Sequence, residues 1–322
     1  MTNDHEQQYT RTTRKKKRKL RVGRVIFTFG FFVIFLMMIY IVVQFTIGKN
    51  MTKNIDIDPG PFEGDAIHPN EPSIENYLLL GMDNDGTGRS RTDTMMVLSW
   101  DKSEGSMRIV SLMRDIYAEI PGYQNYKLNT AYYLGGVQTA KDTVTGMFGI
   151  PIHHYAIVDF DNFESIIDIA FPKGIEVDVQ KKMSKNIGVT LTPGQQKLDG
   201  QELLGYARFR ADEEGDFGRV ARQQEVMSAL KKEAMTFGTV ARSPKILGAM
   251  SNFVETDLTE MDLVKKAIPA LMNKGMTIET LTVPVEGSYW FNSYHHAGSV
   301  IEVNIEENRE AITKFLNAKE GV

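Results

Sequence analysis

Runs of apolar residues differ in length along the chain, and their length and composition predict different elements. Short runs rich in β-branched and aromatic residues predict strands, at 77–82, 94–100, 107–112, 154–160, 174–179 and 278–283. Longer stretches of mixed apolar and polar residues predict helices, at 137–148, 161–170, 199–207, 217–235, 244–254, 260–272 and 305–317. Asp199, followed three residues later by Glu202, has the capping-box pattern at a helix start. Strands and helices intermix, which predicts an α/β or α+β domain with a layered sheet.

One apolar run is much longer than the others. Val25 to Ile47 contains three polar residues in 23. At a rise of about 1.5 Å per residue it is long enough to cross a hydrocarbon core of roughly 30 Å. The basic segment TRKKKRKLRVGR precedes it and an acidic segment follows, so the tail 1–24 is expected in the cytoplasm and the rest outside. A cleaved signal peptide is the alternative, but the run is too long and no small-x-small cleavage site follows.

The overall charge of −4 conceals a strongly basic tail and an acidic remainder. Residues 1–47 hold nine Lys and Arg and two acids, which leaves 28 basic and 39 acidic residues in 48–322, a net charge of −11. Such a domain does not attract nucleic acid by general electrostatics. The chain has no cysteine, which excludes disulfides, thiolate metal sites and cysteine nucleophiles. Residues 48–73 are acidic and rich in proline and glycine, as in a linker, and the globular domain is expected from residue 74.

The first predicted strand opens into a strongly polar loop before the second strand begins. The loop holds Asp83, Asp85, Gly86, Gly88, Arg89, Arg91 and Asp93. Carboxylates suit a hard divalent cation, arginines suit phosphate oxygens, and glycines allow close backbone approach. A metal with a pyrophosphate is the first functional prediction, and a solvated charged turn is the alternative.

Three further polar groups follow along the chain. They are Arg114-Asp115 with Lys127 and Asn129 after the strand at 107–112, the pair Arg208 and Arg210, and the set Asp216, Arg219, Arg222 and Gln223. If this segment is helical, Arg219, Arg222 and Gln223 lie at i, i+3 and i+4 on one face near the helix start, where anions are favoured. Each arginine alone would be an ordinary surface ion pair. Together, in an acidic domain, they predict a phosphate-rich ligand.

Motifs of several other enzyme classes are absent from the sequence. It has no GxxxxGK[ST], no GxSxG and no HExxH, and an EF-hand beginning at Asp83 would place Thr94 where a glutamate is needed. The apolar positions of HHYAIVDFDNFESIIDIAF are expected in the core, with a lipid-binding wall as the alternative.

Seven segments carry a family resemblance and occur in family order. They are LLLGMD, RTDTMMVLS, IVSLMRD, KLNTAYYLGG, HYAIVDFDNF, LTPGQQKLDGQELLGYARFR and GDFGRVARQQEV. The combination resembles the LytR–CpsA–Psr (LCP) proteins, cell-wall glycopolymer transferases of Gram-positive bacteria. The resemblance implies an α/β fold for 74–322, a three-layer α/β/α sandwich around a central mixed sheet with an apolar polyprenyl pocket, behind one N-terminal transmembrane helix.

The resemblance also implies an activity and a set of site residues. The activity is a membrane-anchored, Mg²⁺-dependent (or Mn²⁺-dependent) phosphotransfer that moves a teichoic acid or capsule-type glycopolymer from a polyprenyl-pyrophosphate carrier to peptidoglycan. The implied partners are that lipid-linked polymer, peptidoglycan and the cell membrane, with no nucleic acid. Asp83 and Asp93 would hold the metal. The pyrophosphate would contact Arg89 or Arg91, Arg114, Lys127, Arg208, Arg210, Arg219, Arg222 and Gln223. The catalytic set would be Asp93, Arg114, Asp115, Asp216 and Arg219.

The sequence departs from the family pattern at two places. Asn84-Asp85 stands where an arginine is common in the family, so Arg89 and Arg91 compete for one role, and RTDT replaces the usual RSDT.

Three alternative functions stay open. They are an envelope-related transcriptional attenuator or regulator, a polyprenyl-pyrophosphate-binding scaffold, and a pyrophosphatase in which water replaces the sugar hydroxyl.

Overall fold

The chain divides into two compact units, residues 1–42 and 43–322. The computed structural model describes residues 22–51, 57–70, 73–82, 92–234, 236–263, 265–266 and 277–318. Helix α1 (Val22–Asn50) begins in the first unit, and its last two turns belong to the second. Among the residues whose side chains the structure describes, no helix is long and apolar enough to cross a membrane. These residues do not include 22–31, 33 and 34. The span at 25–47 therefore stays a prediction.

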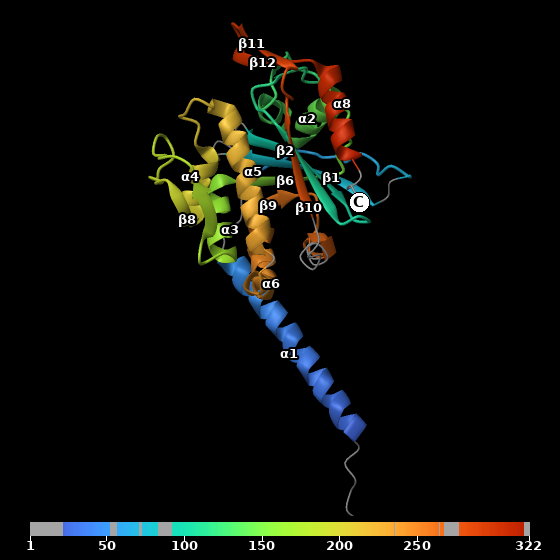
Figure 1. Cartoon of the computed structure of the whole chain (residues 1–322). Coiled ribbons are helices and arrows are strands. Elements are labelled where there is room, and N and C mark those ends of the chain that lie inside the picture. The colour runs from blue at the N-terminus through green and yellow to red at the C-terminus, as the bar shows by residue number, and fades with distance from the viewer. Residues whose placement is uncertain are drawn as a thin grey trace, which may run out of the picture. The chain divides into compact units, whose positions relative to one another are not determined.

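A six-stranded mixed sheet forms the centre of the second unit (Figure 1). Its order is β10 (Thr277–Val283), β3 (Ser106–Leu112), β2 (Thr92–Asp101), β1 (Ile74–Met82), β6 (His154–Asp159) and β9 (Val254–Thr256). The pairs β1–β6 and β3–β10 are parallel, and the other three are antiparallel. The predicted strand at 174–179 is β7 (Ile175–Val179), which pairs with β8 (Gly194–Leu198) outside this sheet.

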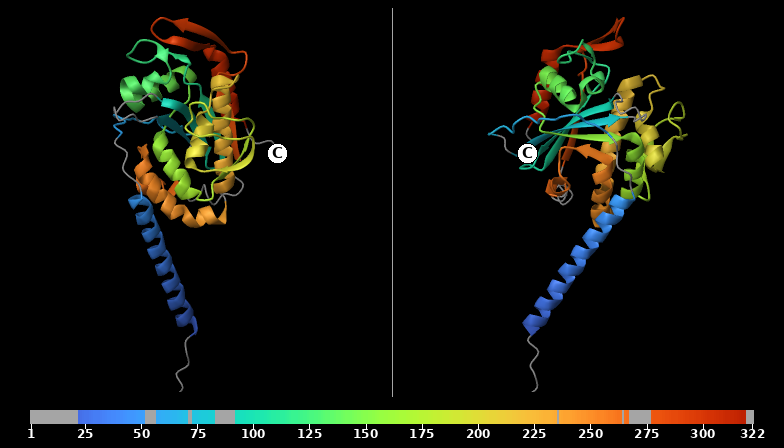
Figure 2. Two further views of the ribbon diagram at one scale, coloured as in Figure 1. Left: turned by 90° about the vertical axis from the view of Figure 1, so that its left-hand side faces the viewer. Right: turned by 180° about the vertical axis from the view of Figure 1, so that it is seen from behind.

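Helices flank both faces of the sheet, because successive residues of each strand point to opposite sides. Leu78 and Leu80 of β1 join a buried core with α2 (Thr130–Phe148) and α8 (Ile305–Leu316). On the other face lie α3 (Phe160–Ala170), α4 (Gly200–Arg208), α5 (Gly215–Ala234) and α6 (Phe237–Phe253) (Figure 2). The α/β class with a central mixed sheet is confirmed. The predicted capping box is also confirmed, since Asp199 caps α4 and bonds reciprocally with Glu202.

Several element boundaries differ from the predictions. The helix predicted at 244–254 begins at Phe237 and ends before Val254, which belongs to β9. The helix predicted at 260–272 is helical at 260–263 and 265–266, and the rest of it lies outside the described residues. Sequence patterns missed β4 (Tyr117–Ala118), β5 (Tyr126–Lys127), β11 (Tyr289–Tyr294) and β12 (Gly298–Val303). These strands are short or exposed, and exposed strands lack the alternation that marks a buried face.

The helix predicted to begin at 137 begins seven residues earlier, with a kink at Gly135 and Gly136. Gly136 has a φ of +72°, and a Cβ there would lie 2.6 Å from the carbonyl oxygen of Pro59. Only glycine fits this position. The segment that contacts it, 57–65, belongs to the predicted linker, yet it packs on the sheet domain. Ile57 is buried in the core, and the Asp65 carboxylate accepts from the Ile152 N–H at 2.7 Å.

Candidate active site

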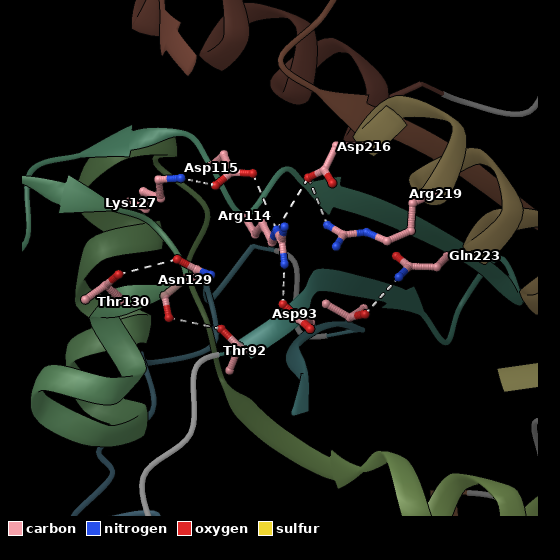
Figure 3. A network of polar contacts seen from close by, with 11 residues as sticks. Thr92, Asp93, Arg114, Asp115, Lys127, Asn129, Thr130, Asp216, Arg219 and Gln223 are labelled. Atoms are coloured by element: carbon pink, nitrogen blue, oxygen red, sulfur yellow. Dashed lines mark hydrogen bonds and ion pairs between the residues drawn. The ribbon is translucent and has the colours of Figure 1, made fainter. Parts of the chain in front are cut away.

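Arg114 lies at the centre of a polar network at one end of the sheet (Figure 3). Its guanidinium is 2.5 Å from a carboxylate oxygen of Asp93 on β2, 3.4 Å from Asp115 and 3.5 Å from Asp216 on α5. Burial would lower the pKa of Arg114, but the charges of Asp216, Asp93 and Asp115 outweigh it and raise the pKa. Three carboxylates from separate segments therefore converge on one cation.

Two more cations complete this network. Lys127 on β5 is 2.7 Å from Asp115, and Arg219 on α5 is 3.0 Å from Asp216. Burial disfavours the ionised form of Asp115, but the hydrogen bond from Lys127 and the charge of Arg114 prevail and lower its pKa. The carboxylate network, defined as Asp93, Arg114, Asp115, Lys127, Asp216 and Arg219, thus holds three acids and three bases. Their formal charges cancel.

A polar pocket with an excess of cations opens beside the carboxylate network. Its volume is about 100 Å³, and its lining residues are Asp93, Lys185, Asn186, Arg208, Arg210, Ala211, Arg219 and Gln223. Four of these side chains are basic and one is acidic. Guanidinium and ammonium groups gathered in this way suit a small polyanion such as a diphosphate.

An apolar pocket of about 210 Å³ adjoins the polar pocket. It lies between the sheet and the helices α3, α4 and α5, and its lining residues are Leu79, Leu80, Gly81, Thr94, Met96, Ala156, Val158, Phe163, Leu204, Ala207, Arg208, Gln223, Val226 and Met227. Arg208 and Gln223 line both pockets. Together the two pockets suit an amphiphile with an anionic head and an apolar tail.

Helix α5 explains why polar and apolar groups meet at this point. Asp216, Arg219, Gln223 and Val226 follow one another at spacings of three and four residues, so they share one face of the helix. The face is ionic near the helix start and apolar two turns later. Gln223 sits at the junction, where its side-chain amide donates to the Thr94 hydroxyl at 2.9 Å.

The prediction that Arg222 shares a face of the helix with Arg219 and Gln223 is wrong, because Arg222 points away from the polar pocket. Its guanidinium is buried, 3.0 Å from Asp212, and it donates to the Phe209 carbonyl at 2.5 Å. Adjacent helical residues are about 100° apart around the axis, so Arg222 and Gln223 point in different directions. Arg222 supports the backbone beside Arg210 and does not line either pocket.

The structure brings most of the predicted site residues together. Asp93, Arg208, Arg210, Arg219 and Gln223 line the polar pocket, and Arg114, Asp115, Lys127 and Asp216 form the network beside it. The backbone N–H of Asn129 donates to the Arg114 carbonyl at 3.1 Å and so holds the Arg114 segment. Arg208 is the last residue of α4, and the chain becomes extended at Phe209.

Asp93 is the one member of the predicted metal pair, Asp83 and Asp93, that lies within the described residues. Asp83, Arg89 and Arg91 lie outside the described residues. Within the described part of the chain, no group of three or more His, Asp or Glu side chains is arranged to hold a metal ion. Asp93 places a carboxylate on the wall of the polar pocket. One or two carboxylates together with phosphate oxygens are what Mg²⁺ usually takes from such a site, so the donor set present fits that ion.

Sequence reasoning missed Lys185 and Asn186, which line the polar pocket from the connection between β7 and β8. Asn186 has a φ of +61°, a conformation that asparagine tolerates better than most residues. The segment KKMSKNIG has no periodicity. Its only usable signal was an asparagine and a glycine in a lysine-rich loop.

The fold and the two pockets define a class: an α/β protein with a composite site suited to an amphiphile that carries a phosphate-rich head. Residues 39–314 match the LytR_cpsA_psr family, and the chain belongs to this family. The family assignment made from the seven sequence segments is therefore confirmed.

The relatives of this chain include a protein named as a regulator and proteins named as transferases. It is 41% identical over 283 residues to the regulatory protein MsrR of Staphylococcus aureus, which covers 87% of this chain and 86% of the relative. It is 32% identical over 256 residues to the polyisoprenyl-teichoic acid–peptidoglycan teichoic acid transferase TagU of Enterococcus faecalis, covering 76% of this chain and 83% of the relative. The crystal structure of TagV from B. subtilis superposes with a TM-score of 0.63 at 27% identity and covers 77% of this chain and 98% of that one.

Proposed function

We propose that this protein is a membrane-anchored, Mg²⁺-dependent phosphotransferase that moves a teichoic acid or capsule-type glycopolymer from a polyprenyl-pyrophosphate carrier to peptidoglycan. The observation that carries the proposal is the shared wall of the two pockets. Arg208 and Gln223 line both the cationic and the apolar cavity, so a ligand with a charged head and a hydrocarbon tail fits across them. The name of the TagU relative, a polyisoprenyl-teichoic acid–peptidoglycan teichoic acid transferase, supports the same donor class.

The donor binds with its diphosphate in the polar pocket and the adjacent part of its tail in the apolar pocket. Arg208, Arg210, Arg219 and Lys185 provide charge-assisted hydrogen bonds to the phosphate oxygens. Positioning and charge neutralisation are most of what phosphoryl transfer requires of a protein. Asp93, with Asp83, would hold Mg²⁺, which when bound neutralises negative charge on the diphosphate.

Transfer proceeds by attack of a muramic acid hydroxyl on the sugar-linked phosphorus. A new oxygen–phosphorus bond forms, the bond between this phosphorus and the bridging oxygen breaks, and polyprenyl phosphate leaves. Asp115 or Asp216 accepts the hydroxyl proton as general base. The lowered pKa of Asp115 keeps its carboxylate ionised at neutral pH. Arg114 holds both candidate bases near the diphosphate site.

Residues 25–47 anchor the chain in the cell membrane, with the basic tail 1–24 in the cytoplasm and the chain after Lys49 outside. This topology places the site where both the lipid-linked donor and the wall acceptor are present. Proteolysis of the outer surface of intact cells tests it, because an exposed second unit is digested and a cytoplasmic one is protected.

The activity is tested with the full chain in detergent, a lipid-linked polymer as donor and peptidoglycan oligosaccharides as acceptor. Arg219→Ala should lower the transfer rate by about 10²–10³-fold, the usual loss when a preorganised charge is removed from the transition state. Lys314→Ala removes a cation from α8, across the sheet from the pockets, and should leave the rate unchanged. Wild-type turnover by the Arg219→Ala protein would contradict the proposal.

A second candidate function, an envelope regulator, is favoured by one observation: the relative at 41% identity is named a regulatory protein. Expressing Arg219→Ala protein in cells that lack this gene separates the two functions. A regulator restores envelope gene expression without transfer, whereas a transferase whose loss disturbs expression indirectly does not.

A further inference from the structure

The hairpin formed by β11 and β12 presents aromatic side chains to solvent. Trp290 is 51% and Phe291 68% exposed. Their neighbour Tyr294 is half-buried and stacks on Tyr117, with the ring centroids 4.5 Å apart. Trp290 and Tyr294 lie on one face of β11 and Phe291 on the other, because successive residues of a strand point to opposite sides. We name these three residues, which border both faces of the hairpin, the aromatic hairpin surface. Adjacent exposed aromatic residues with polar groups around them are a common mark of a binding surface.

The β11–β12 hairpin contacts segments that belong to the carboxylate network or lie next to it. The N–H of Ile301 on β12 donates to the Asp115 carbonyl at 2.9 Å. Tyr289 at the start of β11 packs on Phe217 at 5.3 Å, and Phe217 is the residue after Asp216. The hairpin thus contacts the segments that carry both candidate bases. The hairpin is therefore held beside the acid side of the site.

The charge of the hairpin differs from that of the polar pocket. Residues 289–303 contain no lysine or arginine, whereas four basic side chains line the polar pocket. A phosphate-rich polymer is therefore drawn to the pocket and not to the hairpin. Near the rings, Glu302 accepts from the Asn292 amide at 2.7 Å and from the Tyr294 hydroxyl at 2.5 Å. Rings beside amide and carboxylate groups suit a sugar, whose C–H face stacks on an aromatic ring while its hydroxyls form hydrogen bonds.

We propose that the aromatic hairpin surface binds the glycan strand of peptidoglycan and presents the acceptor sugar to the carboxylate network. This inference rests on the proposed function, because it assigns a binding surface to the acceptor of that reaction. The position of the hairpin favours a wall polymer over a lipid surface. Helix α6, which binds the Lys49 carbonyl near the end of α1 through Asn252, lies at the opposite end of the second unit from the hairpin (Figures 1 and 2).

Binding of uncross-linked glycan strands of alternating N-acetylglucosamine and N-acetylmuramic acid tests the proposal. The full chain in detergent is titrated with these strands in the absence of donor. The double variant Trp290→Ala/Phe291→Ala should bind about tenfold or more weakly, since buried aromatic anchors carry much of the energy of an interface. Trp290→Phe, which keeps an aromatic face, should recover most of the affinity. Met261→Ala removes an exposed apolar side chain elsewhere and should bind like wild type.

Binding of inorganic pyrophosphate with Mg²⁺ is measured in parallel to show that each variant is folded. It should change by less than about twofold in the double variant, because neither ring lines a pocket. Equal glycan affinity of wild type and double variant would overturn the inference, as would absence of glycan binding by the wild type. The inference would also be overturned if the wild-type protein bound phospholipid vesicles and the double variant did not.

The glycan titration separates this inference from the proposed function. If the protein binds glycan through Trp290 and Phe291 but transfers no polymer, the hairpin inference stands and the transferase proposal fails. If transfer proceeds and the double variant retains both glycan affinity and rate, the transferase proposal stands and the hairpin inference fails.

Discussion

The polar pocket and the aromatic hairpin surface flank the same carboxylate network, yet they differ in charge and in the chemistry of their side chains. The pocket side has Lys185, Arg208, Arg210 and Arg219, and it continues into an apolar cavity. The hairpin side has exposed rings and no lysine or arginine between 289 and 303. This asymmetry suggests how one site distinguishes two polymers. An anionic lipid is attracted to one side, and a largely uncharged sugar strand meets the other.

The largest expected effect concerns Asp115 and Asp216, the two candidate general bases of the carboxylate network. Asp115→Asn and Asp216→Asn each keep the side-chain size and remove the proton acceptor. The variant that lacks the general base should lose about 10²–10⁴-fold in transfer rate, and the other should lose less than about tenfold. Donor affinity should hold in both, because neither residue lines a pocket. Single-turnover kinetics with a lipid-linked donor measure the rate, and near-normal rates in both variants would remove the proposed base.

Arg219 and Arg222 provide a second contrast, within one helix. Arg222→Ala leaves the buried Asp212 with Lys181 as its remaining ion-pair partner, 3.1 Å away. The expected loss is about 2–3 kcal/mol in the free energy of unfolding, at or below the roughly 3–5 kcal/mol of a fully broken buried pair, because Lys181 remains. Arg219→Ala should destabilise less and inactivate more. Urea denaturation followed by tryptophan fluorescence measures both variants, and equal destabilisation would show that the two arginines have the same role.

The apolar cavity should matter for the lipid tail alone. Ala156→Phe fills space next to Leu79 and Met96, so the affinity for a long-chain polyprenyl pyrophosphate should fall about tenfold, the scale of a few lost methylene contacts. The affinity for inorganic pyrophosphate should stay constant. Calorimetric titration with the two ligands compares them, and a parallel loss of both affinities would indicate general damage and not a filled lipid site.

The smallest expected effect is a shift in pH dependence. Because the pKa of Asp115 is lowered from 3.8, its carboxylate stays ionised above that value and gains a proton only at lower pH. If Asp115 is the base, transfer should persist down to about pH 5. Lys127→Met removes the hydrogen bond that lowers this pKa, so the acidic limb of the kcat/KM profile should move to higher pH. An unmoved limb in Lys127→Met would exclude Asp115 as the base.

Periodicity predicted the sheet well because its strands are buried. Tyr77 to Leu80 and Met95 to Leu98 are continuous apolar runs, and both lie in central strands covered on two faces. The capping box at Asp199 was predicted because a side chain and a backbone N–H three residues apart make a purely local contact. Residue types alone also predicted the arginines of the polar pocket, since clustered guanidinium groups in an acidic domain need an anion.

Long-range packing determines what the sequence pattern did not predict. The segment 57–65 reads as a linker, and its place beside α2 depends on Gly136 and on the contact of Asp65 with Ile152. The β11–β12 hairpin is half-exposed, and its strands include the polar residues Asn292, Ser293 and Ser299, so they show no regular alternation of apolar and polar positions. The direction of Arg222 required the local geometry of Asp212 and Phe209, which spacing along a helix does not reveal.

A structure of the full chain with a polyprenyl pyrophosphate and Mg²⁺ tests the central claim most directly. The account predicts a diphosphate between Asp93 and Arg219, with the first isoprene units between Leu79 and Val226. A lipid bound elsewhere on the domain, with neither pocket occupied, would contradict it.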